Sequence, residues 1–250
     1  GSLSHPRDSN ITPRSGRGIR SRVSGPRFLL PFDSRTAIRF RRMRERKADP
    51  LLAVVDLGSN SFRLEIGRVE GNQIYQLDTW RETLRFGAGL DDKGRLKRSA
   101  MDAALACLAR FRERLSGLHP TAVRVVATNT FRVATNAQEF IAQAERTLGF
   151  PIDIISGHEE GRLTFFGVAH ELPRSPEPRL VIDIGGGSTE FIIGRGLEAE
   201  RLESLTIGCV GMTQRFFGDG RLTAAAFDAA ETLARVEIEA IAGAFGAGAW

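Results

Sequence analysis

Two short segments of this sequence carry the same arrangement of one acidic residue and several small ones. Val54–Ser61 reads VVDLGSNS, and Val181–Ser188 reads VIDIGGGS at an offset of 127 residues. In each segment an apolar run ends in an aspartate, Asp56 or Asp183, and a turn of small residues follows. Such a turn exposes several backbone N–H groups to phosphate oxygens, and the aspartate is placed to hold a metal ion. The repeat therefore predicts two phosphate-binding turns, one in each half of a duplicated core.

Eight small residues make up the two predicted turns, and each is a candidate phosphate ligand: Gly58, Ser59, Asn60, Ser61, Gly185, Gly186, Gly187 and Ser188. Two ordinary hairpin turns are the alternative interpretation. The repetition argues against it, because the same offset also places Ile66-Gly67-Arg68 over Ile193-Gly194-Arg195.

The second strand of each copy carries a charged residue at the same position, Arg63 in the first and Glu190 in the second. Both lie two residues beyond the turn serine, within reach of a group held by the turn. The planar guanidinium of Arg63 suits phosphate oxygens, and Glu190 can help to hold a metal ion or to position water. Arg63 and Glu190 are thus catalytic candidates, and Asp56, Asp183 and Glu190 are candidate metal ligands. A solvated strand residue is the alternative for Arg63 and for Glu190.

A pair of glutamates, Glu159 and Glu160, opens a predicted helix. Ser156 lies three residues before Glu159, which is a capping-box arrangement. Since successive helical residues diverge by about 100°, Glu159 can cap the helix while Glu160 faces a cleft as a base for phosphoanhydride hydrolysis. Acidic residues also favour helix N-termini for electrostatic reasons alone, so the pattern leaves both interpretations open. The sequence has no Ser-His-Asp or cysteine nucleophile arrangement, and its histidines show no metal-ligand spacing.

The elements that must position these residues follow from hydrophobic periodicity. We expect a three-strand meander at 51–56, 62–69 and 73–84, repeated at 179–183, 189–194 and 198–205. Between the two meanders we expect helices at 97–118, 136–148 and 156–172, and strands at 122–127 and 151–155. Helices at 211–217 and 223–245 follow the second meander.

The net charge of +5 is unevenly distributed over the 250 residues. Residues 1–49 hold thirteen Lys/Arg and four Asp/Glu, about +9, so the rest of the chain comes to about −4. The high pI therefore does not mark a nucleic-acid-binding domain. We expect 1–49 to be a basic disordered tail, with 1–42 an upstream extension behind an expression scar at Gly1-Ser2. A polyanion-binding arm is the alternative. We place one lobe at 50–174 and a second at 175–250, joined by the proline-rich stretch 173–178.

Five segments, in the right order and spacing, together resemble the exopolyphosphatase and guanosine pentaphosphate phosphohydrolase family: Asp56–Arg63, Ala127–Arg132, Ile154–Leu163, Asp183–Glu190 and Ile207–Val210. The resemblance covers about residues 50–250. It implies an α/β fold of the actin/Hsp70/sugar-kinase (ribonuclease H-like) type, with two duplicated lobes that each hold a mixed five-stranded sheet flanked by helices. It also implies Mg²⁺-dependent release of terminal phosphate from polyphosphate or from pppGpp.

Position by position, the resemblance assigns Glu160 to the catalytic glutamate that activates water. Asp183 and Glu190 match the second phosphate and metal motif, Asp56 matches the acid of the first motif, and Arg63 matches the phosphate-binding arginine. Family members continue past the position of Trp250, so the resemblance predicts an incomplete second lobe and a fragment of low activity.

We therefore expect a cytoplasmic, exopolyphosphatase-like phosphohydrolase that uses Mg²⁺ or another divalent cation in a cleft between the lobes. The alternatives are conversion of pppGpp to ppGpp, a non-catalytic polyphosphate or nucleotide sensor, and an ATP-driven actin-like or sugar-kinase protein. The expected partner is polyphosphate or guanosine pentaphosphate, with no membrane and no specific nucleic acid. A homodimer is an open alternative. No apolar run approaches the roughly 20 residues that span a membrane, and two cysteines are too few for a disulfide framework.

Overall fold

The computed structural model describes residues 51–71, 73–118 and 122–245. The predictions for the basic tail at 1–49 lie outside these residues and stay predictions. All described residues belong to a single unit of the chain.

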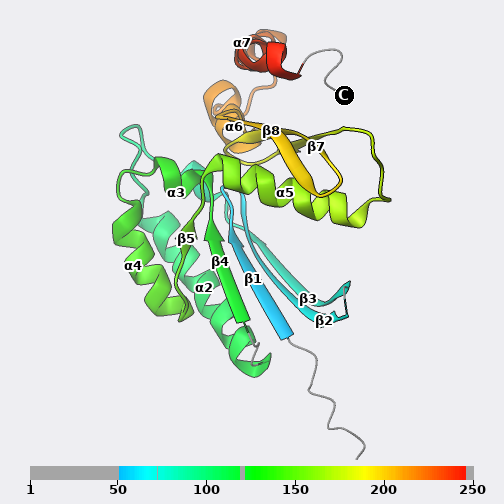
Figure 1. Cartoon of the computed structure of the whole chain (residues 1–250). Helices are drawn as coiled ribbons and strands as arrows, with labels where there is room; N and C mark the ends of the chain where they lie inside the picture. The colour runs from blue at the N-terminus through cyan, green and yellow to red at the C-terminus, as the bar shows by residue number, and fades with distance from the viewer. Residues whose placement is uncertain (1–50, 72, 119–121, 246–250) are drawn as a thin grey trace, which may run out of the picture. The chain divides into compact units, whose positions relative to one another are not determined.

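The first half is built on a five-stranded mixed sheet with the strand order β3-β2-β1-β4-β5 (Figure 1). Its strands are β1 (Leu51–Leu57), β2 (Ser61–Glu70), β3 (Gln73–Thr83), β4 (Ala122–Ala127) and β5 (Asp153–Ile154). The first three form an antiparallel meander, whereas β4 runs parallel to β1 and β5 parallel to β4. Parallel neighbours need a crossover connection, which is made by the helices η2 (Phe86–Gly89), α2 (Arg98–Leu118), α3 (Asn129–Val133) and α4 (Ala137–Leu148).

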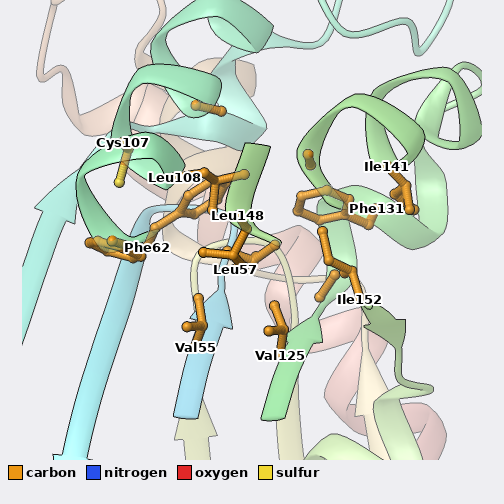
Figure 2. Close-up of a cluster of buried hydrophobic side chains, with 14 of the residues drawn as sticks. Val55, Leu57, Phe62, Cys107, Leu108, Val125, Phe131, Ile141, Leu148 and Ile152 are labelled. Carbon is orange, nitrogen blue, oxygen red and sulfur yellow. The ribbon is translucent and has the colours of Figure 1, made fainter. Parts of the chain in front are cut away.

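One face of this sheet packs against α2 and α4 and forms the main core (Figure 2). Along β1 the residues Ala53, Val55 and Leu57 are buried in it, so Asp56 must lie on the opposite face, because strand side chains alternate. Aromatic rings fill the end of the core nearest the first turn, with centroids 5.3 Å apart for Phe62 and Phe86. Each fully buried side chain of this size contributes about 1.5–3 kcal/mol, which fixes the β1–β2 turn on a rigid base.

The second half begins with an antiparallel three-stranded sheet of β6 (Arg179–Ile184), β7 (Thr189–Arg195) and β8 (Glu198–Leu205). Helix α5 (Gly157–Glu171) packs on one face of it through Phe165 and Ala169, which contact Ile192. The helix lies close to β8 at Gly161. A Cβ there would lie 2.8 Å from the Leu202 side chain, so the absence of a side chain permits this approach. Helices α6 (Cys209–Phe217) and α7 (Ala224–Phe245) follow.

The two halves repeat each other over a longer stretch than the motifs predict. Both meanders have a register shift at the same place, between Ile66 and Gly67 in β2 and between Ile193 and Gly194 in β7. A Cβ at either glycine would crowd the neighbouring strand. At Gly67 it would lie 2.9 Å from Ile74 Cγ2, and at Gly194 it would lie 2.2 Å from the Glu198 carbonyl oxygen. The glycine of each Ile-Gly-Arg repeat thus permits the bulge.

The offset of 127 residues also relates α2 to α7 within one residue. Phe245 of α7 packs on Phe191 and Ile193 of β7, and in the first half Leu108 of α2 belongs to the same core cluster as Phe62 of β2. The strand order, the directions and this duplication confirm the predicted ribonuclease H-like α/β class, with a second sheet of three strands among the described residues.

Three elements differ from the predicted ones. The helices η2 and α3 were not predicted, because four or five residues are too few to show a helical period. Strand β5 has only two residues instead of the expected five, since the Ile152 N–H donates to the Glu145 carboxylate, at 2.9 Å, rather than to a neighbouring strand.

The helices among the described residues are all too short or too polar to span a membrane.

Candidate active site

The two glycine turns have the same local structure. Gly58 N–H donates to the Ser61 carbonyl at 3.2 Å, and Gly185 N–H donates to the Ser188 carbonyl at 2.9 Å. A Cβ at Gly58 would lie 3.0 Å from the same Ser61 oxygen, and one at Gly185 would lie 2.9 Å from the Ser188 oxygen. Each turn therefore favours glycine at its first residue, where a side chain would crowd the carbonyl oxygen that the turn brings back.

The turns also contact each other, although 127 residues separate them. A Cβ at Gly186 would lie 2.9 Å from the Asn60 backbone nitrogen, and one at Gly187 would lie 2.8 Å from Ser59 Oγ. Ser59 is buried in this contact, and its Oγ accepts hydrogen bonds from Thr130 N and Thr130 Oγ1 at 3.2 and 2.8 Å. The predicted turns are thus brought together at one point.

Two carbonyl groups in each turn accept backbone hydrogen bonds from outside the turn, and Ser59 O accepts from Gly87 N. Asn60 O accepts from Leu84 N and Arg85 N, while Gly185 O and Gly186 O accept from the first two amides of α6. In the described part of the chain, no backbone carbonyl accepts from the amides of Ser59, Asn60, Gly186 or Gly187. The joined turns therefore offer N–H donors, which is the polarity that binds phosphate oxygens. The family-like segment Ile207–Val210 supplies the two α6 amides, because α6 begins at Cys209.

A cavity of about 250 Å³ lies over the joined turns. Its lining residues are Asp56, Gly58, Ser59, Asn60, Ser61, Arg63, Arg81, Thr128, Asn129, Glu160, Asp183, Gly185, Gly186, Gly187 and Ser188. All predicted site residues except Glu190 are among them. Arg81 lies outside every predicted motif, whereas Thr128 and Asn129 belong to the family-like segment Ala127–Arg132, which assigned them no role.

Glu190 lies behind the cavity wall. The strand register pairs it with Asp183, as Arg63 is paired with Asp56, so the predicted equivalence of the two positions holds in the backbone. The side chain of Glu190 is fully buried, and its Oε1 accepts from Ser204 Oγ at 2.8 Å. Its Oε2 has no hydrogen-bond partner among the described residues.

Helix α5 places Glu160 on the cavity. Ser156 Oγ accepts from Glu159 N–H at 3.1 Å, so Ser156 caps the helix as predicted. The Glu159 carboxylate, however, does not complete the capping box. It instead binds Arg162 through two hydrogen bonds of 2.7 Å at an exposed position. One turn beyond Glu160, Thr164 Oγ1 lies 3.3 Å from Asp183 Oδ2, which orients this face of α5 toward β6.

The carboxylates around the cavity repel one another. Burial, and then the negative charge of Glu160, raises the pKa of Asp56 to about 6. Burial also raises the pKa of Glu160, opposed by its hydrogen bond from Arg132. The pKa of Glu190 is raised by burial and by Glu160. A site with this excess of negative charge favours a bound cation.

Arg132 is the residue that links the parts of this site. Its Nη1 donates to Glu160 Oε2 at 2.8 Å and to the Ile155 carbonyl at 3.0 Å, and its Nη2 lies 3.5 Å from Ser188 Oγ. It thus joins α3, the start of α5 and the second turn. The sequence contained a signal for it, since Arg132 ends one of the five family-like segments, but no spacing assigned it a role.

No three or more His, Cys, Asp or Glu side chains in the described part of the chain are grouped closely enough to hold a metal ion by themselves. Asp56 and Asp183 nevertheless both line the cavity. Magnesium is commonly held by one or two carboxylates together with substrate phosphates and water, and the donor set here fits that form of binding.

The profile of the Ppx/GppA phosphatase family matches residues 66–250. Among solved structures, an exopolyphosphatase-like protein is 31% identical over 78% of this chain and 62% of its own, with a TM-score of 0.73. The Aquifex aeolicus PPX-GPPA enzyme is 28% identical over 77% of this chain and 64% of its own, with a TM-score of 0.63. An exopolyphosphatase from Cytophaga hutchinsonii is 31% identical over 68% and 53%, with a TM-score of 0.62.

The chain spans less than two thirds of the length of each of these three proteins. They share with it the described fold, and the family profile covers most of the sequence. The chain belongs to the Ppx/GppA phosphatase family.

Proposed function

We propose that the chain carries the catalytic cavity of an exopolyphosphatase, which releases terminal orthophosphate from linear polyphosphate. The observation that carries this proposal is that the Glu160 carboxylate lines the same cavity as the joined glycine turns. A carboxylate base, a set of N–H donors and arginine side chains are the parts that phosphoanhydride hydrolysis requires.

In the proposed reaction the amides of both turns bind oxygens of the terminal phosphoryl group. Glu160 accepts a proton from a water molecule, whose oxygen then bonds to the terminal phosphorus. The bridging P–O bond breaks with its electron pair on the leaving oxygen, so the products are orthophosphate and a chain one unit shorter. Arg132 holds the Glu160 carboxylate in place through the 2.8 Å hydrogen bond.

Asp56 and Asp183 would hold a divalent cation, Mg²⁺ in the first place. When bound, the cation offsets negative charge on the phosphate oxygens. Glu190 is a candidate for a supporting role, since it lies beside Asp183 in the strand register and has a buried oxygen without a partner among the described residues.

The lining of the cavity favours polyphosphate over pppGpp. Every described residue that lines it is polar, charged or glycine, with no aromatic or aliphatic side chain on which a guanine base would pack. A ligand made only of phosphate needs no such apolar side chain.

The test measures orthophosphate released from long-chain polyphosphate and from pppGpp in parallel, with and without Mg²⁺. Mg²⁺-dependent release from polyphosphate supports the proposal, and release from pppGpp alone would redirect it to the nucleotide. Polyphosphate binding without phosphate release would favour the non-catalytic sensor. If the protein neither binds nor hydrolyses polyphosphate, the exopolyphosphatase and the polyphosphate sensor are both contradicted.

A further inference from the structure

A row of three charged residues crosses the first sheet beside the cavity. The register places Arg63 of β2 opposite Asp56 of β1, and Arg81 of β3 opposite Arg63. All three line the cavity. Their sequence neighbours point to the other face, where Phe62 is buried in the core and Glu82 binds Arg110. The row therefore extends the cavity along the outer face of the sheet, away from the turns.

The pair of Arg63 and Arg81 is unfavourable by itself. Like charges directly opposite each other in an antiparallel pair destabilise the sheet. Arg63 is partly offset by Glu65, with Nε 2.9 Å from Oε1. Arg81 has no ion pair among the described residues, since Glu82, the acid next to it in sequence, is held by Arg110 on the opposite face. Two exposed guanidinium groups side by side in a cavity are what an anionic ligand would balance.

We propose that Arg81, together with Arg63, forms an anion subsite for the inner phosphates of a linear polyphosphate chain. This inference rests on the proposed function, because it places the terminal phosphate at the glycine turns. From β1 to β3 the sheet spans two inter-strand spacings, about 10 Å. A chain of several phosphates bridges that distance, whereas a single phosphate at the turns does not.

The surface between the turns and the two arginines is also polar. Ser61 and Thr83 form the cross-strand pair two positions nearer the first turn than Arg63 and Arg81, and their hydroxyl oxygens lie 3.3 Å apart. They belong to the same face of the sheet, because residues two apart in a strand share a face. Hydrogen-bond donors thus continue from the first turn to the arginine pair, along the proposed path of the chain.

The experiment compares Arg81→Ala with Arg68→Ala, a matched loss of one positive charge on the same sheet. Arg68 pairs with Glu70 and does not line the cavity. With long-chain polyphosphate, Arg81→Ala should raise KM about tenfold, the size expected for one charge-assisted hydrogen bond, with kcat nearly unchanged. The difference between the two variants should shrink as the substrate chain is shortened and vanish for chains that do not reach from the turns to Arg81. Arg81→Lys should restore part of the affinity. Equal KM values for both alanine variants on long chains would overturn the subsite.

Direct binding of long-chain polyphosphate separates this inference from the proposed function. If the wild type binds the chain without hydrolysing it, a weaker dissociation constant for Arg81→Ala alone still supports the subsite, whereas equal constants overturn it. No binding by the wild type overturns both proposals. A thermal melt checks folding, and Arg81→Ala should melt at or above the wild-type temperature, since it removes a repulsive pair.

Discussion

The guanidinium of Arg132 holds the carboxylate of Glu160 across two elements of the fold, with Nη1 2.8 Å from Oε2. Both side chains are about one-fifth exposed, so the pair is shielded from most of the solvent. Burial raises the pKa of Glu160 and the hydrogen bond from Arg132 opposes that rise. The arginine therefore has two effects on the proposed base: it fixes the carboxylate in space and favours its ionised form against the effect of burial.

Replacing Arg132 should damage catalysis more than binding. In Arg132→Ala the Glu160 carboxylate loses its anchor, and a misplaced catalytic group costs about 100-fold in rate. The pKa of Glu160 should also rise, so the acid limb of the kcat profile should move to higher pH. Arg162→Ala is the control, because Arg162 pairs with the exposed neighbour Glu159. A pH profile that does not move in Arg132→Ala would remove the electrostatic part of this assignment.

Glu160→Gln tests the base itself. The amide keeps the size of the side chain but cannot accept a proton from water, so phosphate release should fall by a factor of about 10²–10⁴. Polyphosphate binding should stay close to the wild-type value, because the turns and the arginines are unchanged. Glu159→Gln, one residue away, should behave as the wild type. Turnover that survives in Glu160→Gln would rule out the base assignment.

The contact between the two turns can be tested by adding a single methyl group. In Gly187→Ala the new Cβ would lie 2.8 Å from both Ser59 Oγ and Asn129 Nδ2. Because these atoms belong to buried residues of the first half, the turns must separate, and the affinity for polyphosphate should fall at least tenfold.

Gly167→Ala is the matched control for that change. Gly167 lies within α5, and a Cβ there would meet nothing within 4 Å. Since alanine favours a helix over glycine by about 1 kcal/mol, this variant should keep its activity and gain stability in urea unfolding. Equal polyphosphate affinities for the two variants would mean that contact between the turns is not needed for binding.

The sequence predicted the two turns because the residues of each turn are consecutive in the chain, and because the same pattern occurs twice at one offset. Arg81 reaches the cavity only through the pairing of β3 with β2, and Arg132 only through the short helix α3. Neither route leaves a periodic signal in the sequence. The residues to which the sequence assigned no role are thus those whose position depends on strand register and tertiary packing.

The contrast between Arg63 and Glu190 has the same origin. The two occupy equivalent positions in the strand register, yet the Arg63 side chain is half exposed and Glu190 is fully buried. Helix α5 causes the difference, because it packs on the face of the second sheet that holds Glu190 and Ile192. Alignment of the two copies predicts the strand position but carries no information about which face a helix covers.

The raised pKa of Asp56 leads us to expect opposite effects of pH on stability and on activity. Its folded-state pKa is raised to about 6 by burial and by Glu160, above the ordinary value near 4. Between those values the folded protein binds more protons than the unfolded chain, so stability falls as pH rises, by at most about 3 kcal/mol. Activity should instead rise through pH 6, because the proposed cation site needs the ionised carboxylate.

The difference in urea unfolding between wild type and Asp56→Asn isolates this group from all others. Since the asparagine does not titrate, the variant should be the more stable protein above pH 6 and should lose that advantage toward pH 4. Added Mg²⁺ should stabilise the wild type above pH 6 and have less effect on the variant. If the two proteins show parallel stability profiles from pH 4 to pH 7, the carboxylate of Asp56 does not carry the excess negative charge of the cavity.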